Sequence, residues 1–189
     1  MIIGICGLIG SGKDTVAQTL IDNHNFVKTS FADRLKDAVA VMFSWDRELL
    51  DGKTDESRAW REQKDEFWST ETGREITPRL VLQEFGTECM RSGFFDGIWV
   101  SLTKQHLLQN KDKNFVITDV RFPNEVEAIT NEGGSVIKLT RNPFKDKHAS
   151  ETALDKKNFD QSKFTHVINN GGKCSIDNLL VKVKDIYHN

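Results

Sequence analysis

Short apolar runs alternate with longer stretches in which apolar residues recur every three or four positions. The short runs predict buried strands, and the longer period predicts amphipathic helices. The predicted strands cover residues 2–6, 26–31, 114–120, 135–140 and 165–169. The predicted helices cover residues 13–20, 33–43, 78–88, 99–108, 123–129 and 176–186. Strands that alternate with helices in this way indicate an α/β fold, a parallel sheet flanked by helices.

Two charged segments interrupt the pattern. Residues 45–75 carry Trp45, Trp60 and Trp68 among many charges, and we expect a polar insertion with at least one helix there. Residues 141–157 are charged and lack apolar periodicity, which predicts a mobile loop or a lid. A solvated surface loop is the alternative for this second segment.

Composition narrows the class of protein. A chain of 189 residues is expected to form a single domain with an ordinary core. The net charge of −2 gives no support for a nucleic-acid polymer as partner. Cys6, Cys89 and Cys174 are isolated, so neither a zinc site nor a disulfide framework is expected. No apolar run is long enough to span a membrane, and together with the lone thiols this favours the cytoplasm.

The clearest chemical motif lies directly after the first predicted strand. Gly7-Leu8-Ile9-Gly10-Ser11-Gly12-Lys13 has the spacing G-x-x-x-x-G-K and precedes a predicted helix. In that context the glycine backbone can approach a polyphosphate, and the helix N-terminus and the lysine add positive charge. An ordinary glycine-rich turn is the alternative. The residue after Lys13 is usually Ser or Thr, which binds Mg²⁺, but here it is Asp14, so we expect Asp14 to hold Mg²⁺ directly or through water.

Other charged residues follow predicted strands at the same edge of the sheet. Parallel sheets bind ligands at the carboxyl ends of their strands, where Gly7, Asp119, Arg141 and Asn169 are all expected. Asp119 is a candidate for orienting a metal ion, although it could instead cap the next turn. Arg121 and Arg141 are candidates for neutralising a transferred phosphoryl group, although single arginines are often only surface residues.

Five blocks of sequence resemble one family. Gly-Ser-Gly-Lys-Asp-Thr (10–15), Ser-Phe-Ala-Asp (30–33), Leu-Gln-Glu-Phe-Gly-Thr-Glu (82–88), Asp-Val-Arg-Phe-Pro-Asn-Glu (119–125) and His-Ala-Ser-Glu (148–151) are together similar to the phage-type deoxynucleoside monophosphate kinases of the P-loop superfamily. Val-Ile-Asn-Asn-Gly-Gly (167–172) is similar to the strand and turn after which many related kinases hold adenine.

The resemblance implies transfer of the ATP γ-phosphate to a deoxynucleoside 5′-monophosphate, with Mg²⁺. It also implies a helical acceptor-binding region at about 33–110 and a lid at about 141–158. The implied catalytic residues are Lys13, Asp119, Arg121 and Arg141, with Asp14 and Asp119 at the metal. The implied ATP site comprises Gly10, Ser11, Gly12, Lys13, Asp14, Thr15, Asn169 and Gly171. The candidate acceptor contacts are Phe31, Arg34, Lys36, Arg79, Gln83, Glu88, Arg91 and Trp99.

Several alternatives stay open at this stage. Phe31 and Trp99 could be core residues, and Arg79 could only pair with a nearby glutamate. Another small-molecule P-loop kinase, acting on dephospho-coenzyme A or phosphomevalonate, would carry a similar loop. A P-loop switch that reports ATP to a partner would need no lid, and a DNA-binding ATPase would want a basic track. The sequence leaves a homodimer open and does not identify the base or the sugar of the acceptor.

Overall fold

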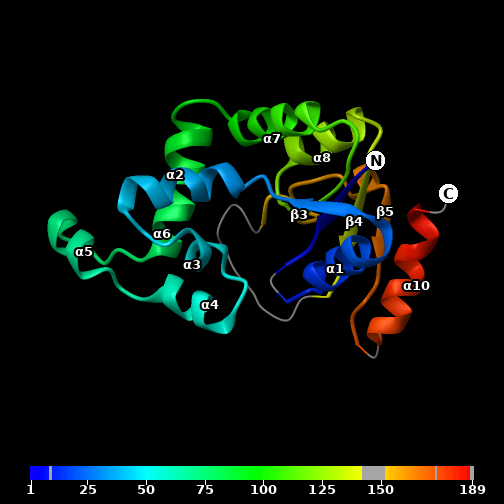
Figure 1. The fold of residues 1–189 in the computed structure, drawn as a ribbon, viewed down its shortest axis with the longest axis horizontal. Helices are drawn as coiled ribbons and strands as arrows, with labels where there is room; N and C mark the ends of the chain where they lie inside the picture. Colours follow the sequence, from blue (N-terminus) through cyan, green and yellow to red (C-terminus); the bar gives the residue numbers. More distant parts are fainter. Residues whose placement is uncertain (9, 142–151, 173, 188–189) are drawn as a thin grey trace. The chain divides into compact units, whose positions relative to one another are not determined.

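The computed structural model describes residues 1–8, 10–141, 152–172 and 174–187. Within these residues five parallel strands form one sheet in the order β2-β3-β1-β4-β5 (Figure 1). The strands are β1 (Ile2–Cys6), β2 (Phe26–Thr29), β3 (Asn114–Val120), β4 (Ser135–Leu139) and β5 (His166–Ile168). The predicted α/β fold with a parallel sheet is therefore confirmed. In this part of the chain no helix has the length and apolar character needed to cross a bilayer.

The chain divides into two compact units. The sheet unit consists of Met1–Phe31 and Thr103–Asn189, and the helical unit consists of Ala32–Leu102. The sheet unit contains α1 (Lys13–His24), α8 (Pro123–Asn131) and α10 (Ile176–Tyr187). Helix α7 (Ile98–Gln109) begins in the helical unit and ends in the sheet unit.

Successive side chains of β1 point to opposite faces of the sheet. Ile3 and Ile5 point into a buried core with α1 and α10, which includes Leu20 and Val183. Gly4 faces the other way, and a Cβ atom built there would lie 2.5 Å from Cδ1 of Ile129 in α8. Burial of each large apolar side chain contributes roughly 1.5–3 kcal/mol, so this core holds β1 rigidly beneath the loop that follows it.

The polar segment 45–75 forms helices α3 (Arg47–Asp51), α4 (Asp55–Glu62) and α5 (Glu66–Thr72) of the helical unit. The expectation of at least one helix is confirmed. Each begins after a side-chain cap: Asp46 accepts from the backbone of Glu48, Thr54 from Ser57, and Asp65 from Trp68. Caps of this kind stabilise a helix by about 1 kcal/mol each, which matters for helices this short.

Aromatic side chains give this segment a small core of its own. Phe43, at the end of α2 (Asp33–Phe43), stacks on Trp45 at 4.7 Å between ring centroids and contacts Trp68 edge-on at 4.9 Å. Trp45 also meets Trp60 edge-on, and its indole N–H donates to Asp65 Oδ2 over 2.9 Å. The tryptophans of the charged segment are therefore packing residues.

The helix predicted over 78–88 changes its winding. It starts as α6 (Pro78–Gln83), with Thr77 as N-cap and Pro78 at the first turn, and continues as the π-helix η1 (Glu84–Ser92). Gly86 lies inside η1, and a Cβ atom there would come within 2.7 Å of Leu35 Cδ2. The glycine thus allows α2 to approach η1 closely.

Candidate functional site

The loop after β1 has the geometry of an anion cradle. Gly10 and Gly12 adopt positive φ angles of 74° and 100°, which residues with a Cβ atom rarely adopt. Gly12 is the N-cap of α1, and because it has no side chain it leaves this helix end without a side-chain cap. The first-turn N–H groups, including that of Thr15, therefore form the kind of site that binds phosphate. Ile9 lies outside the described residues.

Ser11 lies at the centre of this loop. Its side chain is fully buried, and its backbone N–H donates to the Leu8 carbonyl over 3.0 Å. Within the part of the chain that the structure describes, the Ser11 hydroxyl has no hydrogen-bond partner. The hydroxyl packs against Gly7, where an added Cβ atom would lie 2.5 Å from Oγ, so the loop closes tightly around this side chain.

Lys13 folds back over the loop. Its ammonium donates to the carbonyls of Gly7 and Leu8 over 2.6 and 2.8 Å. Burial and, secondly, the nearby charge of Arg121 lower the pKa of Lys13 to about 8, while the charges of Asp14 and Asp119 oppose this shift. The same four side chains therefore share one small region at the carboxyl ends of β1 and β3.

Asp14 occupies the position where the usual motif has Ser or Thr. Its side chain is 79% exposed, and Oδ1 accepts a hydrogen bond of 2.8 Å from the Lys28 ammonium on β2. The predicted metal ligand is thus accessible at the first turn of α1, with a lysine as counter-charge. Lys28 is not among the site residues predicted from the sequence.

Asp119 is held at a defect in the sheet. Gly4 pairs with Ile117 and Cys6 pairs with Val120, so β3 has one more residue than β1 between these matched pairs. Such bulges re-aim side chains next to active sites. Asp119 Oδ1 accepts from the Phe31 backbone N–H over 2.9 Å, and Oδ2 accepts from the Ser30 hydroxyl over 2.8 Å. The carboxylate is fixed at the end of β2 as well as at the end of β3.

Arg121 is positioned by Glu125. The Glu125 side chain is 3% exposed and accepts from the backbone N–H groups of Arg121 and Phe122 over 2.7 and 3.1 Å. This carboxylate caps the start of α8, where a negative charge also suits the helix dipole. The block 119–125 therefore forms one turn in which Glu125 holds the backbone from which Arg121 projects.

The ends of β4 and β5 contribute the turn at 169–172. Asn169 Oδ1 accepts from Thr140 Oγ1 over 3.1 Å and from Gly171 N over 3.3 Å. Arg141 is exposed directly after β4, and its backbone N–H donates to Asn170 Oδ1 over 2.9 Å. Asn170 was missed by the sequence analysis, because an Asn-Asn-Gly-Gly stretch looks like an exposed turn.

The predicted lid is only partly within the described residues. Residues 142–151 lie outside them, so the expectation for those residues has no structural outcome. Residues 152–158 consist mostly of turns in which Leu154 is buried and its carbonyl accepts from Lys138 and Gln161, and the mobile loop or lid stays a prediction for them. The segment lacks apolar periodicity because it consists of turns, with one apolar side chain, Leu154, buried.

The candidate acceptor residues are scattered, and most of their charges are paired. In the helical unit Arg34 pairs with Asp37, Lys36 with Asp51, Arg79 with Glu62 and Arg91 with Asp96. The pairing of Arg79 with a glutamate is the alternative that the sequence left open. Gln83 is half-buried at the end of α6, and Glu88 is exposed on η1.

Two aromatic candidates have the placement of core residues. Trp99 is 6% exposed and donates its indole N–H to the Gly86 carbonyl over 2.9 Å. Phe31 is buried at the end of β2, where its backbone contacts Asp119. Arg91 differs from the other cations because its side chain is almost fully buried, at 4% exposure.

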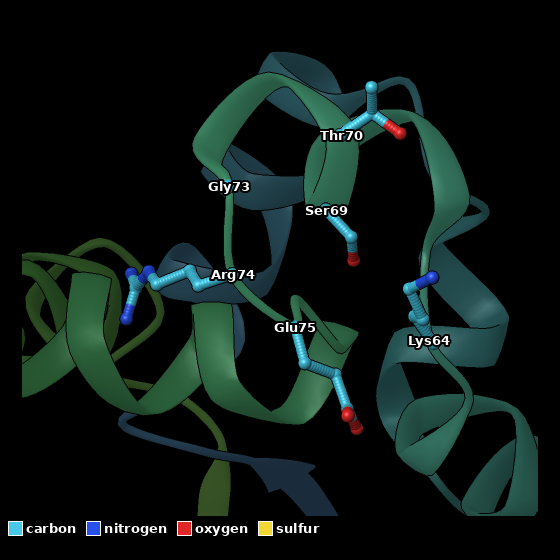
Figure 2. Close-up of a pocket in the computed structure, with 6 residues that line it drawn as sticks. All are labelled: Lys64, Ser69, Thr70, Gly73, Arg74 and Glu75. Carbon is cyan, nitrogen blue, oxygen red and sulfur yellow. The ribbon is translucent and has the colours of Figure 1, made fainter.

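A hollow in the helical unit is not a convincing phosphate site. Figure 2 shows its lining residues, Lys64, Ser69, Thr70, Gly73, Arg74 and Glu75. Arg74 extends away from the other labelled side chains and forms a two-bond ion pair with Glu84. Lys64 pairs with Glu66, and Ser69 Oγ accepts from Ile76 N. The cations of this hollow are therefore already neutralised.

Comparison with known proteins gives consistent matches. The family model described as deoxynucleotide monophosphate kinase matches residues 48–183. A protein of Acanthamoeba polyphaga mimivirus, named as a deoxynucleotide monophosphate kinase, is 35% identical over 82% of this chain and 82% of its own. The deoxynucleoside-5′-monophosphate kinase of Escherichia phage T5 is 26% identical over 68% of this chain and 71% of its own.

Proposed function

The chain belongs to the deoxynucleotide monophosphate kinase family, and we propose that its site at the ends of β1 and β3 moves the γ-phosphate of ATP to a deoxynucleoside 5′-monophosphate. One observation carries the assignment of the site. Lys13 and Asp14 begin α1 directly after the loop, Asp119 and Arg121 lie at the end of β3, and β3 pairs with β1, so two distant segments bring these four residues to the same edge of the sheet. A phosphate loop, two carboxylates and an arginine in one region are what phosphoryl transfer requires.

The loop 7–15 holds the triphosphate in this proposal. The N–H groups at the start of α1, which no side chain caps, are the donors available to phosphate oxygens. Lys13 leaves the two carbonyls and contacts the outer phosphates, since an anion is a stronger partner for an ammonium than a carbonyl. Asn169 and Gly171, in the turn after β5, are proposed to border the nucleoside of ATP.

Arg121 acts on the phosphoryl group during transfer. In such reactions the protein contributes mainly by positioning and by neutralising charge on the transferred group. Glu125 holds the Arg121 backbone with a charge-assisted hydrogen bond, which fixes the point from which the guanidinium projects. Arg141 is the second candidate for this role.

The carboxylates suit Mg²⁺ rather than a metal with an all-protein cage. The described residues contain no group of three His, Cys, Asp or Glu side chains that could hold an ion. Mg²⁺ is normally held by one or two carboxylates together with phosphate oxygens and water, which matches Asp14 and Asp119. When bound, the ion would neutralise charge on the phosphate oxygens, while Ser30 and the Phe31 N–H hold the Asp119 carboxylate in its orientation.

The acceptor contacts are proposed from the helical unit considered by itself. Arg91 on η1 is the candidate we favour for a phosphate contact; its guanidinium is almost fully buried and paired with the exposed Asp96, so an acceptor phosphate would have to replace that partner. Gln83, Glu88 and Arg79 lie on the same helical stretch, α6 and η1. π-helical segments are frequent at functional sites, which supports this stretch over Arg34 and Lys36 on α2.

A transfer screen tests the function. ATP, Mg²⁺ and the wild-type chain are incubated with each common deoxynucleoside and ribonucleoside monophosphate, and with dephospho-coenzyme A and phosphomevalonate. We expect the diphosphates of one or more deoxynucleosides, with lower rates for the ribonucleotides. Transfer to dephospho-coenzyme A or phosphomevalonate alone, or slow hydrolysis with no transfer, would refute the proposal.

A further inference from the structure

Asn170 joins two strand ends that meet at the proposed ATP site. Its side chain is 5% exposed, although its neighbours Asn169 and Gly171 are exposed. Nδ2 donates to the Ser11 carbonyl over 2.7 Å, and Oδ1 accepts from the Arg141 N–H over 2.9 Å. One buried amide thus connects the loop after β1 to the backbone after β4.

The two hydrogen bonds require an amide. The Ser11 carbonyl can only accept and the Arg141 N–H can only donate, so the group between them must offer one donor and one acceptor on a single short side chain. Asparagine offers both, with an orientation fixed by its two partners. Aspartate would keep the bond to Arg141 but would place an oxygen against the Ser11 carbonyl.

The backbone on both sides of Ser11 is glycine. Gly10 and Gly12 both adopt positive φ angles, and glycine loses more conformational freedom on ordering than other residues. The Ser11 side chain itself has no partner within the described residues. The Asn170 amide is therefore a direct restraint on the peptide between Ser11 and Gly12, close enough that a Cβ atom on Gly12 would lie 3.7 Å from Nδ2.

We infer that Asn170 is a positioning residue for phosphoryl transfer, which holds the phosphate loop and the backbone of Arg141 in one fixed arrangement. The inference rests on the proposed function, since it assigns Asn170 to the site that binds ATP. Asn170 does not touch the reacting atoms. It acts through Ser11 and Arg141, so its loss affects ATP binding and turnover more than it affects the acceptor.

Three variants separate the two bonds. Asn170→Asp removes the bond to Ser11 and keeps the bond to Arg141, whereas Asn170→Ala and Asn170→Leu remove both. The Kd of ATP is measured without acceptor by equilibrium binding, and steady-state rates give KM for each substrate. We expect Asn170→Asp and Asn170→Ala to raise the Kd of ATP about tenfold, because a buried hydrogen bond is lost, with KM for the monophosphate within about twofold.

A destabilised control excludes a purely structural role. Val183→Ala removes buried volume from α10 in the same unit but contacts neither Ser11 nor Arg141 through a hydrogen bond. Its Tm is expected to fall as much as that of Asn170→Ala, while its Kd for ATP stays at the wild-type value. If Asn170→Ala and Asn170→Asp raise the Kd no more than Val183→Ala does, the inference is wrong.

A double-mutant cycle tests the connection to Arg141. If Asn170 acts through Arg141, the change Arg141→Ala should lower kcat less in an Asn170→Ala background than in the wild type. Additive effects would overturn this part. The proposed function is tested separately: it fails if the wild-type chain transfers phosphate to no deoxynucleotide. In that case the Kd of ATP still shows whether Asn170 holds the phosphate loop.

Discussion

The Ser30 hydroxyl donates a hydrogen bond of 2.8 Å to Oδ2 of Asp119, although 89 residues separate the two in the sequence. The contact ties the end of β2 to the bulge in β3, next to the phosphate loop. Because Asp119 is a proposed metal ligand, Ser30 stands in the outer shell of that ligand. Such outer partners fix the orientation of a ligand and are often as important as the ligand.

Replacing Ser30 by alanine should therefore weaken Mg²⁺ use. We expect the Mg²⁺ concentration for half-maximal activity to rise about 10- to 100-fold, because Asp119 loses the hydrogen bond that orients its Oδ2. Magnesium titrations of the steady-state rate measure this, with the exposed Ser101→Ala as control. An unchanged Mg²⁺ requirement in Ser30→Ala would remove Asp119 from the metal site.

Lys13→Met removes the ammonium that the loop encloses. We expect kcat to fall about 10²- to 10³-fold, since a charge aimed at the transferred phosphate is lost. The Tm should not fall, because burial of the Lys13 charge is itself unfavourable, as the lowered pKa shows. The matched control is Lys113→Met, an exposed lysine whose ammonium donates to Oδ1 of Asn110 at the surface. Near-normal turnover in Lys13→Met would contradict the phosphate-loop assignment.

Arg121→Ala distinguishes catalysis from binding. An arginine that acts on the transferred phosphoryl group contributes about 10³- to 10⁵-fold in rate in related chemistry, so we expect a large loss of kcat. The Kd of ATP should change by less than about tenfold. Stopped-flow binding and steady-state rates give the two quantities, and Arg58→Ala, an exposed arginine of the helical unit, serves as control. Equal losses in both quantities would make Arg121 a simple binding residue.

The carboxylate of Asp51 should make the free energy of unfolding depend on pH. Burial by itself would raise its pKa, but hydrogen bonds from Lys53 and Arg47 and the charge of Lys36 outweigh burial and hold the pKa far below its usual value. The ionised group therefore stabilises the folded state above about pH 4, and this contribution is lost as the pH falls further. Asp51→Asn should cost about 1–3 kcal/mol at pH 7 and progressively less below pH 4.

Urea unfolding of Asp51→Asn and wild type at several pH values measures this difference. The exposed Glu71→Gln is the control, since its stability should follow the wild type at every pH. A constant difference between Asp51→Asn and wild type from pH 7 to pH 2.5 would show that the charge of Asp51 is not the cause.

The secondary-structure elements that were predicted correctly from the sequence are those long enough to show a regular spacing of apolar residues. The predicted helix 33–43 has the bounds of α2, and the apolar run 114–120 has those of β3. Helices α3 and α5 are too short for periodicity, and only their caps, Asp46 and Asp65, signalled them. The winding of η1 has no local signature, because it depends on how Gly86 packs against Leu35.

The site residues that could be predicted are those that belong to a motif within one continuous segment. Lys13, Asp119 and Arg121 follow strands, and topology alone brings them together. Asn170 was not predictable, since its burial comes from two backbone partners far away in the sequence. Lys28 was missed for the same reason, because its pairing with Asp14 depends on the position of β2.

The hydrogen bond between Ser11 and Asn170 joins residues that are 159 positions apart, and this separation affects how the chain folds during synthesis. A ribosome releases the phosphate loop long before the amide that secures it. Strand β1, which is made before β3 and β4, must wait for these two strands before either of its edges is paired. Long-range pairing of this kind slows folding and leaves strand edges exposed to aggregation. A nascent chain that stops before β5 would therefore carry a complete motif and no competent nucleotide site.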